Sequence, residues 1–478
     1  MAPLFFGSVD LLWVIIWTAL LSAAMLCGPA EPIGARQRAI LSAFIAISSA
    51  YALIAVVQVI PHLVGRLDDP IWQRTNDLLQ LGVSPRISSR AEIPPVAIGH
   101  FLLSVTSLVS GFFVGTSRRG GELVAAFARH AILLYAIYGL LALALTPGLL
   151  LWAPKLAYRG SLTASFVNHN TAATFMGAGA ILWFCSAFLT AEALRVSSLR
   201  LLVLLPTNEE AAFKLILRLA AGLTCFFALL LTGSRGGLIC SCLGLLVGLG
   251  LMIANRLKPG VWYVLASASA ALAAMLVWLS HMGRIGSEGL FDNGRWRVYG
   301  FCLEAIRQHP LLGAGAGTFP EIFPSLRTAD FEPYGVWEHA HSTILEIAVE
   351  MGVPIAAIIA AAAVASVFIL ARAALKSKDR NRRVFAATAG ILVLSYTHST
   401  IDFSLQIPGY LIVFGIILGC GLARSAADET PPPQKAGSRL SVVAGSPVRT
   451  RKPVFETVSE TVSETASESS SISGSNAK

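Results

Sequence analysis

The sequence predicts an all-α membrane protein with about eleven (ten to twelve) transmembrane helices and one large periplasmic loop that contains short helices. Of its 478 residues, 55% are hydrophobic and only 13% are charged, and that charged fraction is about half the value typical of soluble proteins. The hydrophobic residues form long blocks, as helices need in order to cross a hydrocarbon core about 30 Å thick. None of the blocks alternates between polar and apolar residues, which excludes the strands of a spanning barrel.

The hydrophobic blocks define the expected membrane spans. The first block follows no basic segment and has no clear small-residue cleavage site, so we interpret it as a retained span and not as a signal peptide. In chain order, the predicted spans are residues 9–28, 38–60, 96–115, 128–150, 170–190, 214–232, 236–254, 261–281, 343–372, 384–400 and 408–424.

The basic residues predict the orientation, because cytoplasmic loops are enriched in Lys and Arg. The densest basic set follows the span at 343–372 and runs from Arg372 to Arg383. Its loop is therefore expected in the cytoplasm, and residues 282–342 are expected in the periplasm of a bacterial inner (cytoplasmic) membrane. The same asymmetry explains most of the net charge of +9, for which nucleic-acid binding is a poor explanation.

Three regions follow from these patterns. Residues 1–150 form the N-terminal transmembrane helices, and residues 151–424 form a second membrane domain that includes loop 282–342. Residues 425–478 end in a repeat with glutamate at every fourth position, where the charges would repel one another on a helix. With few apolar residues to bury, this tail is expected to be disordered and cytoplasmic.

The seven cysteines indicate neither a disulfide framework nor a metal site.

Polar residues at the ends of spans carry the candidate chemistry, because ionisable groups in a membrane usually mark function. The first cluster contains Arg159 and the triplet Asn168, His169 and Asn170. Asn168 is well placed to cap the helix that follows. Alternatively, the triplet hydrogen-bonds to a sugar or phosphate with help from backbone amides at the helix start.

The second cluster is the turn Thr232–Gly237, which contains Arg235. An arginine at this position either snorkels to the membrane surface or binds an anion, since a guanidinium matches phosphate oxygens in a bidentate fork. The turn also opens the next span, and a helix N-terminus favours negative charge.

The third cluster, Arg295 and Arg297, opens an amphipathic segment that ends at Pro310. Arg295 is the stronger ligand candidate of the two. The glycine-rich residues 311–317 follow, but no strand precedes them and no Lys-Ser/Thr pair closes them, so they do not form a phosphate loop. We expect a flexible turn beneath a site.

The fourth cluster is His339-Ala340-His341, followed by Glu346 and Glu350 on one helix face. Two neighbouring histidines without a clear third ligand favour acid–base work or oriented hydrogen bonding over metal binding. The glutamates are expected to pair with the arginines or to orient His341. Residues 398–402 lie at the same end of the next span and are candidates to complete the cavity.

The order of these clusters resembles the O-antigen ligase and polymerase superfamily of polytopic membrane glycosyltransferases over roughly residues 160–420. Gly352 lies ten residues beyond Ser342, as in the ligase signature, but Ile355 stands where that signature has Gly, Thr or Tyr. The resemblance implies catalytic roles for His341, Arg295 and Arg235. With the clusters above, it gives as candidate substrate-binding residues Asn168, His169, Asn170, Arg159, Arg297, His339 and Glu346.

The resemblance implies transfer of a glycan from undecaprenyl diphosphate to an acceptor hydroxyl at the periplasmic face, without a metal or other cofactor. The reaction would serve surface polysaccharide biosynthesis, as O-antigen or exopolysaccharide. The implied partners are the lipid-linked glycan donor, a lipid A core or glycan acceptor, and the bilayer.

Alternatives remain open within and outside this superfamily. A ligase, a polymerase and a protein O-oligosaccharyltransferase share these motifs, and we favour a ligase or polymerase because no added acceptor-specific domain is recognised. A polysaccharide flippase or permease would need charged groups distributed through several spans. In this sequence the charged clusters gather at one face, which argues against transport.

Overall fold

The computed structural model describes residues 2–27, 32–90, 95–194, 209–254, 293–328, 330–331, 337–377 and 379–427. The chain divides into two units, Met1–Asp428 and Glu429–Lys478, and all described residues belong to the first. The predicted span at 261–281 and the predicted disorder of nearly all of the tail concern residues outside these ranges.

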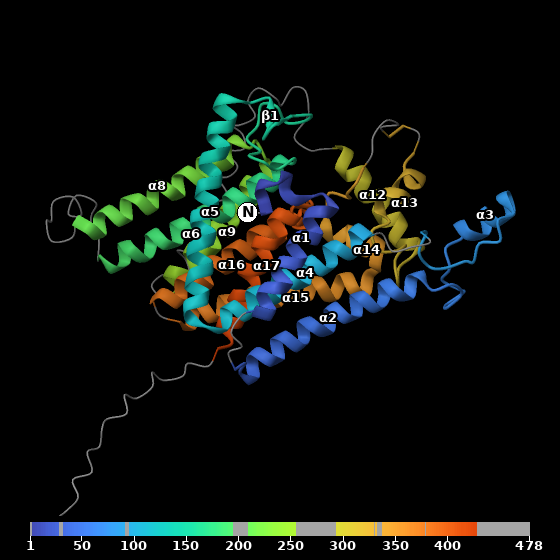
Figure 1. Ribbon diagram of the computed structural model, residues 1–478, viewed down its shortest axis with the longest axis horizontal. Coiled ribbons are helices and arrows are strands. Elements are labelled where there is room, and N and C mark those ends of the chain that lie inside the picture. The colour runs from blue at the N-terminus through green and yellow to red at the C-terminus, as the bar shows by residue number, and fades with distance from the viewer. Residues whose placement is uncertain are drawn as a thin grey trace, which may run out of the picture. The chain divides into compact units, whose positions relative to one another are not determined.

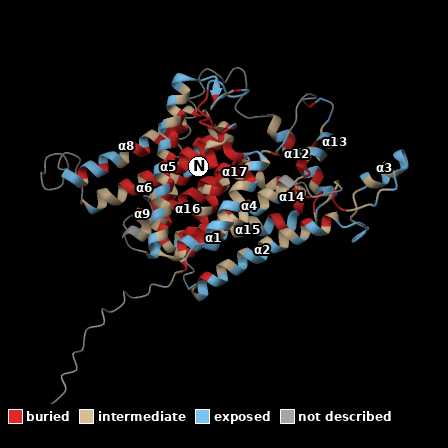
Figure 2. Cartoon of the chain, in the orientation of Figure 1, coloured by how far each residue is buried: buried red, intermediate tan, exposed pale blue. Residues whose placement is uncertain are grey.

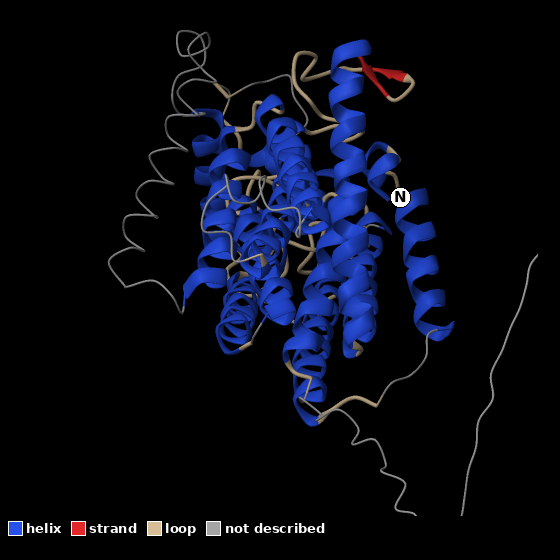
Figure 3. Cartoon of the chain, turned by 90° about the vertical axis from the view of Figure 1, so that its left-hand side faces the viewer, coloured by secondary structure: helices blue, strands red, loops and turns tan. Residues whose placement is uncertain are grey.

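The described residues are almost entirely helical (Figures 1 and 3). The long helices are α1 (Leu11–Cys27), α2 (Ala35–Val59), α4 (Pro95–Thr116), α5 (Arg118–Leu145), α6 (His169–Ala193), α8 (Glu209–Leu231), α9 (Arg235–Ile253), α12 (Asn293–Gln308), α15 (Val353–Lys376), α16 (Asp379–Ser399) and α17 (Pro408–Ser425). The short elements are η1 (Ala2–Leu4), η2 (Phe6–Ser8), α3 (Ile71–Leu79), α13 (Phe319–Leu326), α14 (Thr343–Met351), η5 (Ser404–Gln406) and the antiparallel hairpin of β1 (Leu149–Leu150) and β2 (Ala153–Pro154).

Eight helices of the described ranges are long and apolar enough to cross a membrane, which makes this a multi-pass membrane protein. They are α2, α4, α5, α6, α8, α9, α15 and α17. Helix α1 has only 17 residues, and α16 begins with the charged stretch Asp379–Arg383. The total of eleven spans therefore stays a prediction.

The predicted span at 343–372 is wrong as a single helix, because the chain breaks at Gly352 into α14 and α15. Gly352 has φ +84° and ψ 163°, a backbone conformation that residues with a Cβ rarely adopt. A Cβ at this position would also collide with the backbone carbonyl of Leu311. Because the segment is apolar on both sides of Gly352, its hydropathy does not indicate the break.

The glycine-rich segment 311–317 is held by backbone hydrogen bonds, whereas the sequence predicted a flexible turn. The amides of Ala314 and Gly315 donate to the carbonyls of Val349 (2.9 Å) and Glu350 (3.1 Å) at the end of α14. The amide of Val353 in turn donates to the carbonyl of Pro310 at 2.9 Å. The glycines allow this close approach of two backbones, so the segment fixes the break between α14 and α15.

The fourth predicted span starts ten residues earlier than expected, at Arg118. The hydroxyl of Ser117 accepts the amide of Gly120 at 2.9 Å and caps the new helix at once. The connection after α4 is consequently the single residue Ser117.

The core lies where α6, α9, α16 and α17 pack together, and Figure 2 shows the buried residues concentrated there. Small residues allow these helices to approach closely, as at the contact of Gly244 in α9 with Gly390 in α16. Helix α6 starts, α9 starts and α16 ends at polar residues, so three helix ends meet around one polar cluster.

The predicted loop contains the 16-residue helix α12 and the 8-residue helix α13. Their aromatic side chains form a separate hydrophobic cluster that includes Phe301, Phe319, Phe323 and Phe331. Helix α14 joins this cluster through Val349 and so connects the loop helices to α15. The periplasmic location of this loop stays a prediction.

Candidate functional site

Asn168 caps α6, which agrees with the simpler of the two interpretations of the first cluster. Its side-chain oxygen accepts the backbone amide of Asn170 at 2.8 Å, and the residue is buried. The side chain is therefore committed to the helix start.

Asn170 links three distant parts of the chain. Its Nδ2 donates to Oδ1 of Asp402 at 2.9 Å, and its Oδ1 accepts the hydroxyl of Ser234 at 2.7 Å. The start of α6, the start of α9 and the turn after α16 are therefore fixed to one another by a single amide. Because Asn170 is buried, breaking either bond would leave a polar atom unsatisfied inside the protein.

Asp402 is the centre of this network. The residue is fully buried, and its second carboxylate oxygen accepts the hydroxyl of Ser404 at 2.6 Å. Nearby, Oγ1 of Thr174 and Nδ1 of His398 are hydrogen-bonded at 2.7 Å. From the sequence, His398 and Asp402 are only candidates to complete the cavity, and no sequence motif indicates Thr174 or Ser404. The sequence feature that could have indicated this network is Asp402 itself, an acidic residue directly after an apolar helix.

His169 lies on the other side of the α6 start. Its Nδ1 is 2.8 Å from the carbonyl oxygen of Thr232, and its ring stacks on Tyr158 with the centroids 4.1 Å apart. A carbonyl only accepts, so Nδ1 carries the proton in this hydrogen bond. Arg159, next to Tyr158, is exposed and donates from Nε to the carbonyl of Lys155 at 3.0 Å.

Arg235 is the first residue of α9. Ser234 caps the helix by accepting the amide of Gly237 at 3.1 Å, and Gly233 turns the chain with φ +70°. A Cβ on Gly236 would lie 3.5 Å from the His398 ring, so this helix start packs closely against the end of α16. Arg235 is thus held at a helix N-terminus, which also favours a bound anion.

Arg295 brings α12 to the same place. Its Nη1 donates to the carbonyl of Ile401 at 2.9 Å, directly before Asp402. The charge of Arg295 also acts on His341 and on His398. The structure therefore brings together two residues, Arg295 and His341, that the sequence identified separately.

Arg297 is differently placed. It forms an ion pair with Asp330 at 2.8 Å, donates to the hydroxyl of Thr328 at 3.0 Å and lies over the Phe331 ring. The side chains of Arg297 and Asp330 are 40% and 75% exposed. These contacts tie α12 to residues 328–331 and do not join Arg297 to the Asp402 network.

His341 is held by its backbone and by aromatic rings. It has a φ of +54°, its carbonyl accepts the hydroxyl of Tyr299 at 2.9 Å, and its ring lies against Trp337 and Phe403. Its Nδ1 is 3.2 Å from the carbonyl oxygen of His339, so Nδ1 carries the proton and Nε2 the lone pair. Burial and the charge of Arg295 lower the pKa of His341, which keeps the ring neutral and able to accept a proton.

His339 has the opposite character. Its Nδ1 is 3.0 Å from Oε1 of Glu346, whose Oε2 accepts the amide of Ala340 at 2.7 Å. Burial alone would lower the pKa of His339, but the hydrogen bond and charge of Glu346, with smaller effects of Glu350 and Glu338, raise it. We expected Glu346 to pair with an arginine or to orient His341. Instead it pairs with His339, because residues 339–341 fold back onto the first turn of α14.

The site thus combines positive charge, a neutral imidazole and a buried carboxylate at one end of the bundle. Within the described ranges, no group of three His, Cys, Asp or Glu side chains is arranged to hold a metal ion. The arrangement is suited to stabilising a developing anion while a proton is accepted.

Comparison with protein families gives a match to the family described as O-antigen ligase over residues 220–360. That range contains Arg235, Arg295 and His341 but neither Asn170 nor Asp402. A search of curated proteins finds no match to the chain.

Proposed function

We propose that this chain, which matches the O-antigen ligase family over residues 220–360, transfers or polymerises lipid-linked oligosaccharide in surface polysaccharide biosynthesis. The donor is a glycan on undecaprenyl diphosphate, and the acceptor is a hydroxyl of a lipid A core or of another glycan. The reaction takes place at the periplasmic face of the bacterial inner membrane.

The contact of Arg295 with the turn before Asp402 is the observation that carries this proposal. It brings a guanidinium to the turn that also anchors Asn170, and the charge of the same guanidinium acts on His341. Transfer from a diphosphate needs fixed positive charge where the leaving group develops negative charge. Arg295 meets this need, with Arg235 at the start of α9 as the second cation.

His341 serves as the base in this proposal. The acceptor oxygen bonds to the anomeric carbon while the bond from that carbon to the diphosphate oxygen breaks. The hydroxyl proton passes to Nε2 of His341, and the electron pair leaves with undecaprenyl diphosphate. A neutral ring whose Nδ1 is engaged by the His339 carbonyl is suited to this step.

The remaining candidates take supporting roles in the proposal. His169 and Arg159 contact the donor from the side of Tyr158, and His339 with Glu346 binds the acceptor next to His341. Asn168 and Asn170 act by holding the start of α6 against Ser234 and Asp402. Arg297 is retained as a substrate-binding candidate at the outer edge of α12.

Three alanine variants test the proposal. Arg235→Ala, Arg295→Ala and His341→Ala are each expected to abolish glycan transfer while membrane insertion stays intact. Surface polysaccharide is compared on gels, and insertion is measured by the amount of protein in membranes. Unaltered surface polysaccharide in all three variants would end the catalytic interpretation.

A deletion strain separates the two forms of the reaction. Accumulated single repeats on the lipid carrier indicate a polymerase, whereas long chains left on undecaprenyl diphosphate indicate a ligase. A periplasmic reporter fused near Thr328 tests the orientation and should be active. An inactive reporter there would place the site on the other side of the membrane.

A further inference from the structure

A second cluster of positive charge lies at the other end of the helix bundle. A pocket between α5, α6, α16 and α17 contains Arg129 and Arg383. Arg383 and His398 are 15 residues apart on α16, which corresponds to roughly 22 Å along the helix. The pocket is therefore distinct from the site around His341.

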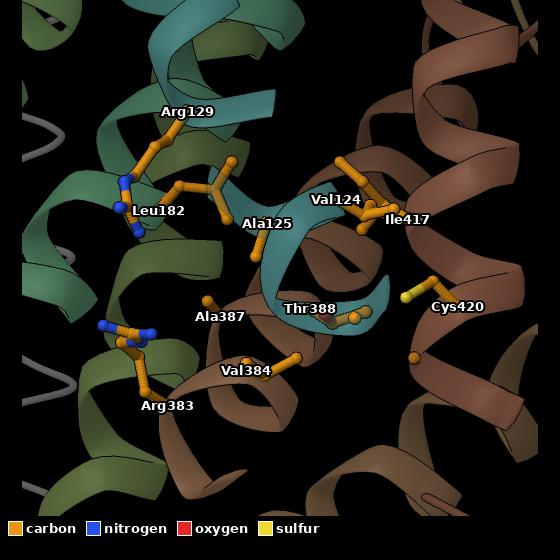
Figure 4. A pocket seen from close by; sticks show the side chains of 12 residues that line it. Val124, Ala125, Arg129, Leu182, Arg383, Val384, Ala387, Thr388, Ile417 and Cys420 are labelled. Atoms are coloured by element: carbon orange, nitrogen blue, oxygen red, sulfur yellow. The ribbon is translucent and has the colours of Figure 1, made fainter. Parts of the chain in front are cut away.

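The walls of this pocket are apolar and its charged groups are both cationic. Val124, Leu182, Val384 and Ile417 line it, and none of its twelve lining residues is acidic. Figure 4 shows the side chains of Arg129 and Arg383 ending on the same side of the pocket. A ligand that touches both walls and cations must carry an anionic group next to an apolar body.

The side chain of Arg129 is fixed in place, but one of its hydrogen-bond donors has no acceptor. Its guanidinium lies 5.3 Å from the centre of the Trp183 ring, and the Trp183 indole donates to the Arg129 carbonyl at 2.9 Å. The Nε of Arg129 is buried and has no hydrogen-bond partner in the described part of the chain. A buried N–H without an acceptor is costly, so this group favours an incoming oxygen.

The arginines also repel one another. The charges of Arg383 and Arg218 both act unfavourably on the charge of Arg129. Arg218 is anchored to α6, where its Nη1 donates to the Ser186 carbonyl at 3.2 Å. Positive charges gathered in this way beside a membrane are stabilised by an anion between them.

We propose that this pocket binds the phosphate of an anionic phospholipid, with an acyl chain along the apolar wall. The anionic headgroup accepts hydrogen bonds from Arg129 and Arg383, and the lipid thereby joins α5 to α16. Basic pockets between membrane helices on the cytoplasmic side are typical sites for such headgroups, and this is the end that the basic residues assign to the cytoplasm. The proposal is independent of the reaction at the His341 site.

The test uses the full-length protein in detergent and measures lipid binding by native mass spectrometry and by thermal unfolding. Phosphatidylglycerol is compared with phosphatidylethanolamine and with millimolar inorganic phosphate. We expect phosphatidylglycerol alone to stay bound and to raise the unfolding temperature. Arg129→Gln and Arg383→Gln should each weaken its binding about fivefold.

Arg372→Gln is the matched control, since Arg372 is an exposed arginine near the end of α15 and does not line the pocket. Its binding should equal that of the wild type. Equal retention of both lipids would mean that the arginines only snorkel to the surface and would overturn the proposal. Displacement of the lipid by inorganic phosphate would overturn it in favour of a site for free anions.

Folding of the variants needs a separate check, because Arg129 also packs on Trp183. If Arg129→Gln does not elute as a monodisperse protein, Arg383→Gln and the lipid titration of the wild type carry the test. Wild-type binding that does not distinguish the lipids, or an Arg383→Gln variant that binds phosphatidylglycerol as the wild type does, would then refute the site.

Discussion

The Asp402 network and the His339–His341 segment lie side by side but are built on different principles. In the network, Asn170, Ser234 and Ser404 bond to one another or to a fully buried carboxylate. In the segment, His341 is positioned by its backbone and by aromatic rings, and its Nε2 makes no hydrogen bond to the described residues. The network therefore fixes helix ends, whereas the segment positions the ring that we propose as the base.

The comparison separates stability from chemistry. Side chains that satisfy one another have little capacity left for a substrate, so changes in the network should act mainly through folding and placement. Loss of the neutral His341 ring has a different effect, since it removes a proton acceptor that no other described side chain replaces at that position. Both regions meet at residues 401–403, where Arg295 bonds to Ile401 and Phe403 packs on both histidines.

The largest expected effect on the rate of glycan transfer comes from His341, compared with its neighbour His339. His341→Ala should lower the rate of glycan transfer by about 10²–10⁴-fold, the range for loss of a positioned base. His339→Ala is the comparison variant, and it should lose less, because it removes a contact to the acceptor and its hydrogen bond to Glu346 but leaves the base in place. Initial rates with lipid-linked donor in proteoliposomes measure both. Equal losses in the two variants would contradict the assignment of His341 as the base.

The next effect is on stability, from Asp402→Asn. The change keeps the shape but turns one accepting oxygen into a donor, so either Asn170 or Ser404 loses its acceptor. We expect a loss of about 1–3 kcal/mol in the free energy of unfolding, seen as a lower unfolding temperature in detergent. Thr400→Ala, at an exposed neighbouring position, serves as the control. An Asp402→Asn variant as stable as the control would refute the structural role of the network.

How far the sequence predicts this site depends on how local each feature is. The cap by Asn168 and the positions of Arg235, Arg295 and His341 follow from short motifs at helix ends. The bond between Asn170 and Asp402 joins residues 232 positions apart, and no local pattern indicates that pairing. Glu346 was expected to pair with an arginine or to orient His341, but His339 hydrogen-bonds to its carboxylate, next to the left-handed backbone of His341.

A smaller effect concerns the pH dependence of transfer. Burial and the charge of Arg295 lower the pKa of His341. The ring therefore stays neutral at pH values below the ordinary pKa of histidine. Activity falls only when the pH drops through this lowered pKa. Arg295→Gln removes a charge that disfavours protonation, so the acid limb of the residual activity should move to higher pH. Arg295→Lys keeps the charge and should leave the limb in place. Identical acid limbs in all three proteins would show that Arg295 does not act on the titrating base.

The smallest effect should come from Arg297, two residues from Arg295 on the same helix. Its ion pair with Asp330 is exposed, and such pairs contribute at most about 1 kcal/mol. Arg297→Ala should therefore leave thermal unfolding nearly unchanged and lower transfer far less than Arg295→Ala does. Rates measured over a range of donor concentrations make the test sharper, because a role in donor binding raises KM while a structural role leaves it constant. A loss of transfer as large as that of Arg295→Ala would mean that Arg297 leaves Asp330 to bind the substrate, and the site would then extend along α12 beyond the residues that meet at Asp402.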